Sequence, residues 1–445
     1  MYRRLATISV VAVVIHVTAA LDGAELTVGP GKNFARIEAA LAKATPGDVI
    51  LVFQLEDNKP YGQVAVYVAK PNIVFRAARS HGQRVRLSGQ GFNYSGVGST
   101  PRAIFQFNHG ADGCVLEGFE LSDAHNDSHN GAGVRINQAN HITVSDCQLH
   151  DNDMGIMSNG DGTDKAGVNQ RIESCLIHAN GNLQDPGYNH NLYLGGTSVT
   201  LSACEIHSSL TGHNVKSRAH QTRVEYCYIH DSCNREFDLV DAKYDTTRPD
   251  SHAILLGNVI VKARNCEGNR GVIHFGQDGG KEHDGTLSVV HNTIVTPFIS
   301  PVVQLTAAKA KLQLFNNLVW DGGSRQGGQK LVDFSRSGRE AVSGSNNWLP
   351  AGFSGNLAEL KLANTHLAER RENPPFGASD QGDFRLNQPD VSIVGAGLPW
   401  SKLSPTLPMG AKQGEKLYQY KPPLGREPRL RDDQPDLGAF ELPGR

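Results

Sequence analysis

Methionine and tryptophan are scarce in this chain, with 4 and 3 copies in 445 residues, whereas glycine occurs 48 times. Glycine supplies the positive φ angles of tight corners, so this balance is typical of a turn-rich β architecture. An excess of charge is also lacking, because 43 Lys and Arg face 45 Asp and Glu for a formal net charge of −2. No global field would draw the protein to nucleic acid or an acidic membrane, so a charged ligand must be held by a local patch.

The sequence also lacks an apolar run at its N-terminus long enough to span a membrane comfortably. The run from Leu5 to Val17 is too short. It follows Arg3 and Arg4 and precedes Thr18-Ala19-Ala20, which is the basic, apolar and small-residue order of a secretory signal. We therefore expect residues 1–24 to be a cleaved signal peptide. The mature chain is expected to be a secreted or periplasmic monomer that does not insert into the membrane.

An even set of cysteines is missing as well, because the chain has seven. An odd number excludes complete disulfide pairing within the chain. Four of them recur at one position of a repeat and would stack about 4.8 Å apart as small buried side chains: Cys147, Cys175, Cys204 and Cys227. Structural packing is thus favoured over disulfides or metal ligation.

What the chain does contain is a six-residue cassette: an aliphatic residue, two variable positions, Cys or Asn, one variable position and another aliphatic. Its copies lie between 23 and 34 residues apart, which is the period of a solenoid. A second short strand recurs between the copies, as a parallel β-helix requires. The seven copies begin at Val144, Ile172, Leu201, Val224, Leu255, Val289 and Leu314.

The repeat defines the expected domain organisation. Residues 33–345 are predicted to form a right-handed parallel β-helix, with an all-β fold. An amphipathic helix over residues 33–44 places Phe34, Ile37 and Leu41 on one face and would cap the first coil. From residue 346 to 445 the cassette is lost in sequence rich in Pro, Gly and charge, which we interpret as irregular C-terminal coils and a capping tail.

Polar residues gather on the outward-facing positions of the second strand in the middle coils. With an offset of 23 residues, His190, Asn191 and Tyr193 superpose on His213, Asn214 and Lys216. Such a strip suits an acidic, uronate-containing polysaccharide, because sugars stack on Tyr, Asn bonds hydroxyl groups and basic side chains pair with carboxylates. We expect His190, Asn191, Tyr193, His213 and Asn214 to bind this substrate.

The same strip contains the groups needed for β-elimination. That reaction removes the proton α to the uronate carboxylate, so it needs a base and a positive charge. Lys216 is the expected base, kept neutral by like charges on the flanking Arg218 and Arg235. Arg218 or Arg235 would then neutralise the substrate carboxylate or act as the acid.

The residues leave three alternatives open. Glu236, Asp238 and Asp241 could bind a Ca²⁺ that neutralises the carboxylate, although no cofactor is fixed by the sequence. Asp238 with Glu236 or Asp241 could instead hydrolyse a glycosidic bond. A carbohydrate-binding or surface protein without catalysis is the third alternative.

Other recurring polar residues are interpreted as structural. Four histidines follow the cassette at one offset and are expected to stack or to bond backbone carbonyls at a turn: His150, His178, His207 and His230. Asn258, Asn292 and Asn317 are expected to form an amide ladder from coil to coil.

The chain as a whole resembles the right-handed parallel β-helix, or pectate-lyase-like, superfamily of polysaccharide-active proteins. The segment from Gly212 to Ala219 is similar to one that recurs in exported bacterial members. Lys216-Ser217, with an Arg near the next coil, also looks like the alginate lyase and chondroitinase B family. There a Lys base and an Arg acid lie on adjacent coils, which implies Lys216 as base. Arg235 precedes its strand, and Val240 is the residue expected to stack on Lys216.

Overall fold

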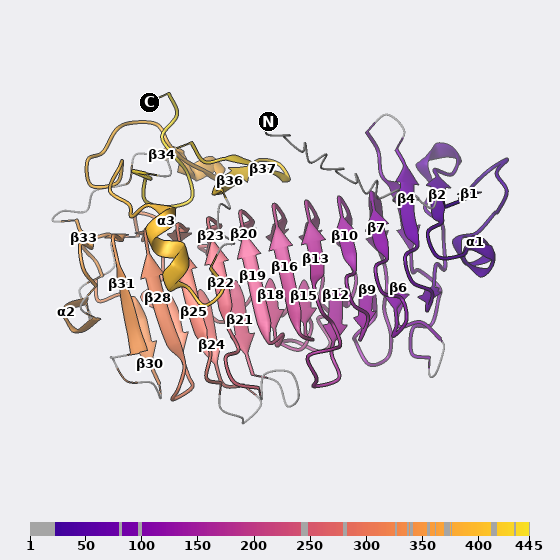
Figure 1. The fold of residues 1–445 in the computed structure, drawn as a ribbon, viewed down its shortest axis with the longest axis horizontal. Helices are drawn as coiled ribbons and strands as arrows, with labels where there is room; N and C mark the ends of the chain where they lie inside the picture. The colour runs from indigo at the N-terminus through magenta and orange to yellow at the C-terminus, as the bar shows by residue number, and fades with distance from the viewer. Residues whose placement is uncertain are drawn as a thin grey trace, which may run out of the picture.

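Three parallel sheets of twelve, eleven and ten strands run along the molecule (Figure 1). In this computed structural model, each strand hydrogen-bonds to the strands of the same sheet that come from the preceding and following turns of the chain. Parallel strands joined by connections of one hand wind the chain into a helix of coils. The protein is therefore a right-handed parallel β-helix, as the repeat predicts.

The structure describes most of the chain. The described residues are 23–79, 82–96, 100–241, 248–278, 283–324, 327–335, 338, 341–353, 357–360, 362–368, 374, 376–410, 416–430 and 433–444. The expected signal peptide lies outside them, apart from its last two residues.

Each complete coil contributes one strand to each sheet. The twelve-stranded sheet contains β1 (Glu25–Val28), β2 (Val49–Phe53), β4 (Val74–Ala78), β7 (Val115–Glu117), β10 (Thr143–Ser145), β13 (Gln170–Glu173), β16 (Ser198–Ser202), β19 (Gln221–Glu225), β22 (Ala253–Leu256), β25 (Thr286–Val290), β28 (Lys311–Phe315) and β31 (Val342–Ser345). The eleven-stranded sheet contains β5 (Val85–Ser88), β8 (Phe119–Ser122), β11 (Gln148–His150), β14 (Leu176–His178), β17 (Glu205–His207), β20 (Tyr228–His230), β23 (Val259–Val261), β26 (Thr293–Val295), β29 (Leu318–Trp320), β32 (Trp348–Leu349) and β33 (His366–Leu367). The ten-stranded sheet contains β3 (Val66–Val68), β6 (Ala103–Phe107), β9 (Ala132–Asn137), β12 (Met154–Asn159), β15 (Leu192–Leu194), β18 (Val215–Ser217), β21 (Phe237–Val240), β24 (Ile273–Gly276), β27 (Val303–Leu305) and β30 (Val332–Phe334).

The cassettes form the corner between the twelve-stranded and eleven-stranded sheets. In the first copy, Val144 lies on β10, Leu149 lies on β11, and Cys147 fills the corner with no exposed surface. The residue before the Cys or Asn has a positive φ in every copy, from 52° at Asp146 to 65° at Gly257. Gly257 is the one glycine among the seven, so the corner imposes this conformation mostly on residues that have a side chain.

The corner residues stack from coil to coil as expected. The backbone N–H of Cys175 donates to Sγ of Cys204 at 3.4 Å, and all seven cysteines are free thiols. In later coils the ladder changes to amides, where Asn258 Nδ2 donates to Oδ1 of Asn292 at 3.0 Å. Amides that bond along the stack satisfy polar groups that would otherwise be buried without partners.

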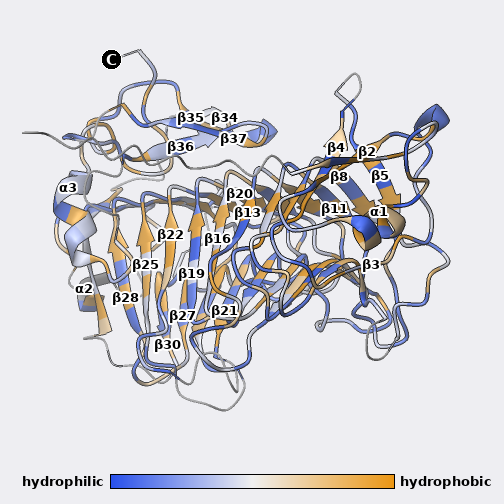
Figure 2. Cartoon of the chain, turned by 45° about the vertical axis from the view of Figure 1, so that its right-hand side comes forward, coloured by the Kyte–Doolittle hydropathy of each residue, from blue (hydrophilic) through white to orange (hydrophobic). Residues whose placement is uncertain are grey.

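The core fills the space between the three sheets. One continuous cluster of buried apolar side chains extends from Val28 to Leu360. Apolar segments recur along the strands of the stacked coils (Figure 2). On the ten-stranded sheet, alternate residues point into this core, and Val134, Ile156, Leu192 and Val215 have no exposed surface. Their strand neighbours face outward, which is what places polar side chains on the surface of the ten-stranded sheet.

A short helix covers the first coil. α1 (Ile37–Lys43) buries Ile37, Ala40 and Leu41 against the end of the core. It begins later than the expected residue 33, because Phe34 forms a parallel bridge with Val28. The described helices include none that is both long and apolar enough to cross a membrane.

The C-terminal tail packs on the outside of the β-helix. Its outer part contains α3 (Trp400–Leu403) and two antiparallel hairpins, β34 (Phe376–Ala378) with β35 (Asp383–Leu386) and β36 (Tyr418–Lys421) with β37 (Gly425–Pro428), whereas Leu360 of α2 (Leu357–Leu360) belongs to the core cluster. α3 buries Trp400 and Leu403 against Ile254 and Leu256 of β22. The hairpins and following loops pack on β23, β26 and β29 (Figure 1). These contacts lie on the twelve-stranded and eleven-stranded sheets.

Candidate functional site

A row of polar side chains lies at one register position on the outer face of the ten-stranded sheet. Tyr193 of β15 pairs with Lys216 of β18, and Lys216 pairs with Asp238 of β21. Asp238 in turn pairs with His274 of β24. Strand alternation directs all four side chains outward, because the residues between them fill the core.

Asp238 occupies the centre of this row and is surrounded by nitrogen atoms. Its Oδ1 lies 2.7 Å from Nδ1 of His274 and 3.7 Å from Nη1 of Arg235. Its Oδ2 lies 2.7 Å from Nζ of Lys216 and 3.5 Å from Nε2 of His213. Only 4% of the Asp238 side chain is exposed, so these four neighbours replace water around a buried carboxylate.

The neighbours decide the charge of this carboxylate. Burial alone would raise the pKa of Asp238, but the charge that His213 carries once it is protonated at about pH 4 and below, the hydrogen bond from His274 and the charge of Lys216 outweigh it. They hold the pKa of Asp238 well below its usual value, so Asp238 is an anion at neutral pH. It cannot serve as a proton donor there.

Two stacked imidazoles border the row. The rings of His190 and His213 lie 5.1 Å apart and nearly parallel. Burial lowers the pKa of both, to about 4 for His213, so both are neutral near pH 7. Nδ1 of His190 accepts the backbone N–H of His213 at 3.0 Å, and Nδ1 of His213 accepts that of Arg235 at 3.2 Å. Each neutral ring therefore carries its proton on Nε2 and presents a donor.

The more exposed part of the site is built from Tyr193, Lys216, Arg218 and Asp278. Oη of Tyr193 accepts Nε–H of Arg218 at 3.1 Å. Oδ2 of Asp278 lies 2.9 Å from Nζ of Lys216 and also accepts from Nη2 of Arg218. The Asp278 side chain is 39% exposed. Two cations thus share one carboxylate oxygen beside a phenol, at a position open to solvent.

The placement expected for Asn191 and Asn214 is wrong. Both are fully buried, because they belong to a ladder inside the turn that precedes the ten-stranded sheet. Nδ2 of Asn191 donates to Oδ1 of Asn214 at 2.8 Å, and Nδ2 of Asn214 donates to Oε2 of Glu236 at 2.6 Å. The chain bends before the strands begin at Leu192 and Val215, so outward alternation does not extend to these residues. Their amides are not on the surface that a sugar would reach.

The two carboxylates beside Lys216 were not predicted from the sequence. Lys216 donates to Asp238 and Asp278, and these carboxylates also contact Arg235 and Arg218, respectively. Two carboxylates in contact with its amine suit a residue that binds and neutralises anions. Besides its 3.7 Å contact with Asp238, Arg235 donates to Oε1 of Gln304 at 3.0 Å.

The register that stacks Val240 on Lys216 is wrong by two residues. Lys216 pairs with Asp238, 22 residues further along the chain, whereas stacking Val240 on Lys216 would need 24, so the outward phase is kept. This difference brings a carboxylate next to the lysine. Tyr193 lies beside Lys216 and His213 beside Asp238, whereas His190 stacks on His213.

The three acids considered for Ca²⁺ or for hydrolysis point to different places. Glu236 has no exposed surface and bonds to Asn214 and to the backbone N–H of Ser232. Asp241, also fully buried, accepts the backbone N–H of Asp278 at 2.5 Å. Neither acid joins Asp238 in a cluster of three donor atoms within the part of the chain that the structure describes. The described geometry therefore does not fit a Ca²⁺ site at these residues.

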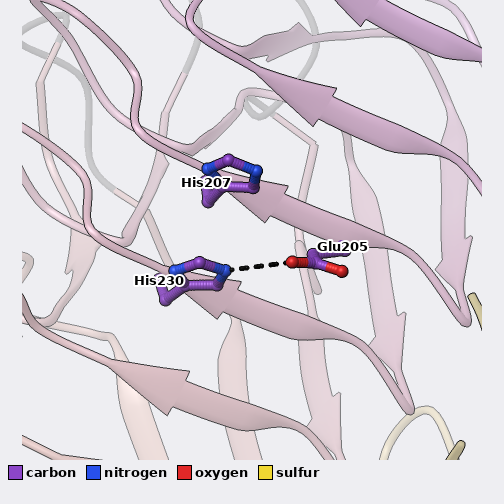
Figure 3. Close-up of side chains that lie close together, drawn as sticks. All are labelled: Glu205, His207 and His230. Carbon is purple, nitrogen blue, oxygen red and sulfur yellow. Dashed lines mark hydrogen bonds and ion pairs between the residues drawn. The ribbon is translucent and has the colours of Figure 1, made fainter. Parts of the chain in front are cut away.

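One group of potential metal ligands does occur among the described residues, at Glu205, His207 and His230 (Figure 3). Its three donor atoms lie within 4.8 Å of one another, and His230 Nε2 is 3.4 Å from Oε1 of Glu205. The same 3.4 Å contact joins His150 to Glu120, so it is a repeated ladder contact. The two rings are parallel, and their in-plane lone pairs do not converge on one point. The expected stacking is confirmed, with ring centroids 5.1, 5.0 and 4.7 Å apart along His150, His178, His207 and His230.

His274 and Asp278 are the two site residues that sequence reasoning missed. His274 lies in a strand that the repeat identified, and pairing from Asp238 would have placed it on the outer row. Asp278 follows that strand in a loop, 62 residues from Lys216, and no repeat position marks it.

No protein-family model and no curated protein matches this chain. Among solved structures, the pectate lyase Pel9A is similar with 14% identity and a TM-score of 0.49, covering 95% of this chain and 98% of that one. The alginate lyase from Paenibacillus sp. str. FPU-7 is similar with 15% identity and a TM-score of 0.46, covering 65% of this chain and 93% of that one. At such identities the likeness concerns architecture, and the chemistry has to be argued from the residues of this chain.

Proposed function

We propose that this protein is an exported lyase that cleaves an acidic, uronate-containing polysaccharide by β-elimination on the outer face of β15, β18 and β21. Lys216 and Arg218 are the cations that bind and neutralise the uronate carboxylate. Tyr193 is the proton acceptor, in place of Lys216. Secretion to the periplasm or beyond and a monomeric state remain predictions from the sequence.

The observation that carries the proposal is the position of Asp278. Its carboxylate is exposed and is held by both Lys216 and Arg218, and Arg218 also donates to Oη of Tyr193. A carboxylate of the chain itself thus occupies a place where two cations and a phenol converge. A uronate carboxylate that displaced it would bring the adjacent C–H bond towards Tyr193.

The proposed step balances within this set of groups. The C5 proton moves to the phenolate oxygen of Tyr193, which Arg218 stabilises by donating Nε–H to it. The C4–O4 bond breaks, a double bond forms between C4 and C5, and the departing O4 takes a proton. Tyr193 can return the proton that it received, which restores the phenolate. Lys216 and Arg218 stabilise the charge that develops on the carboxylate.

The geometry favours elimination over hydrolysis. A hydrolase needs one carboxylic acid that is protonated and a second carboxylate across the sugar. Asp238 is an anion at neutral pH, and Glu236 and Asp241 are buried in other contacts. A protein that only binds the polysaccharide would use the same cations, and the next experiment separates that alternative.

The test is to incubate the protein with polygalacturonate, alginate and glycosaminoglycans while following ultraviolet absorbance of unsaturated products together with reducing ends. Elimination predicts that both signals rise in parallel for at least one polymer. Reducing ends without absorbance would identify a hydrolase. Retention of a polymer with neither signal would identify a binding protein and contradict the lyase.

Replacing Asp278 with Asn is expected to lower KM for the cleaved polymer by about two- to fivefold. The variant removes a carboxylate that competes for Lys216 and Arg218, and an exposed ion pair of this kind is worth under about 1 kcal/mol. KM is measured from initial rates of absorbance. Asp333→Asn is the matched control, because Asp333 lies on the same outward row and its loss changes the net charge equally. An unchanged or higher KM would show that Asp278 does not occupy the substrate site.

A further inference from the structure

Arg135 lies on the same outward row as the site, three strands away. It pairs with Gln106 of β6 and with Met157 of β12, and Met157 pairs with Tyr193 of β15. Lys216 is the next residue in the row. Three strand spacings are about 14 Å, a span longer than one sugar ring and within reach of a short oligosaccharide.

Arg135 differs from the cations of the site because no acid pairs with it within the described residues. Its guanidinium donates to Sδ of Met157 at 3.4 Å, a weak acceptor, and it forms no ion pair there. Arg102, the nearby second arginine, donates to Oδ1 of Asn130 at 3.3 Å and likewise has no carboxylate partner in the described structure. Burial and, to a smaller extent, Arg102 lower the pKa of Arg135 to about 10, which leaves it charged at neutral pH.

Two neighbouring guanidinium groups without a counter-charge attract an anion, and Arg binds carboxylates through paired hydrogen bonds. We propose that Arg135, assisted by Arg102, forms a second anion subsite that binds a carboxylate of the same polysaccharide chain several sugars away from the bond that is cut. This inference rests on the proposed function for the class of ligand. In this arrangement the bound polysaccharide lies parallel to the β-helix axis and extends from Arg135 to Lys216.

The surface between the two anion positions suits a sugar chain. Met157 and Tyr193 border a small apolar cluster on this face. The aromatic ring of Tyr193 and the side chain of Met157 can pack against the apolar faces of pyranose rings. Beside them, Nδ2 of Asn159 donates to Oδ1 of Asn137 at 3.0 Å, and Asn137 donates to Asn108 at 3.2 Å. This amide ladder follows the same axis. Asn137 and Asn159 are partly exposed, so their side-chain amides can hydrogen-bond to the hydroxyl groups of a sugar.

The experiment measures binding of oligogalacturonates and oligomannuronates of two to eight sugars by calorimetry. It uses a Tyr193→Phe background so that turnover does not shorten the ligand. Arg135→Gln is expected to weaken binding of the octamer about tenfold and to leave binding of the dimer within twofold, because only a long chain reaches both positions. Arg102→Gln should have a smaller effect in the same direction. Arg171→Gln is the control, because Arg171 pairs with Glu173 on the twelve-stranded sheet.

The outcomes separate this inference from the proposed function. If Arg135→Gln weakens octamer binding in the Tyr193→Phe background and the wild-type protein gives no unsaturated products, the subsite is retained and the lyase is removed. If the wild-type protein eliminates and octamer affinity in the Tyr193→Phe background is the same with and without Arg135→Gln, the subsite is removed and the lyase is retained. Equal weakening of dimer and octamer, or no binding of either ligand by the protein with Arg135 intact, would also overturn the subsite. Circular dichroism and Tm confirm that each variant is folded.

Discussion

Replacing Tyr193 with Phe is expected to lower kcat for elimination by about 10²- to 10⁴-fold, the range that general acid–base groups contribute. The variant keeps the aromatic ring and removes the oxygen that accepts Nε–H of Arg218. Because Phe still packs against the sugar, KM should change much less than kcat. Initial rates of ultraviolet absorbance over a range of polymer concentrations provide both constants.

Tyr188→Phe is the matched control, because Tyr188 lies in the preceding loop and is 74% exposed. Its loss of a hydroxyl group should leave both constants within twofold. Lys216→Met provides the complementary measurement. If Lys216 neutralises the carboxylate, both binding and kcat fall. A full rate in Tyr193→Phe, together with a loss of kcat at constant KM in Lys216→Met, would return the role of base to Lys216.

The fold could be predicted because every coil has the same packing requirement at its corner. An aliphatic residue must enter the core on both sides of a corner, and a small or amide side chain must fill it, as Val144, Cys147 and Leu149 do. Such a requirement recurs at a fixed spacing and is visible in the sequence alone. The histidine column follows from the same regularity, because residues at one offset in successive coils must stack.

The site was predicted less well because it depends on features that do not repeat. Strand alternation correctly turns Tyr193 and Lys216 outward, but the loop before β21 sets which residue meets Lys216, and it differs in length from the preceding loop. The bend before each strand buries Asn191 and Asn214, which periodicity alone cannot show. Asp278 reaches the site from a loop of another coil, so only the folded chain brings it to Lys216.

Replacing Lys262 with Met is expected to destabilise the protein by about 3–5 kcal/mol, the cost of leaving a buried charge without its partner. Nζ of Lys262 lies 3.5 Å from Oε1 of Glu236, and neither side chain has exposed surface. The ammonium also donates to the carbonyl of Ser232 at 3.1 Å. Chemical denaturation at neutral pH, monitored by circular dichroism, measures the free energy of unfolding of both proteins.

The pH dependence of this loss identifies its cause. Burial already raises the pKa of Glu236, and Lys262 is the largest influence that lowers it. Without Lys262 the folded-state pKa rises further above the unfolded value, so the folded variant gains stability from proton binding as pH falls. The deficit relative to wild type should therefore shrink as the pH falls from neutral into the acid range, because Glu236 takes up a proton in the folded variant. Adding Glu236→Gln to the variant should recover part of the loss at neutral pH, because Gln carries no charge and its one carbonyl oxygen still accepts from one of the two donors, the Asn214 amide or the Ser232 N–H. A deficit that is constant with pH and persists in the double variant would instead mean that Lys262 acts through packing of its side chain. The ladder of Asn191 and Asn214 would then end at the Glu236 carboxylate without needing a counter-charge.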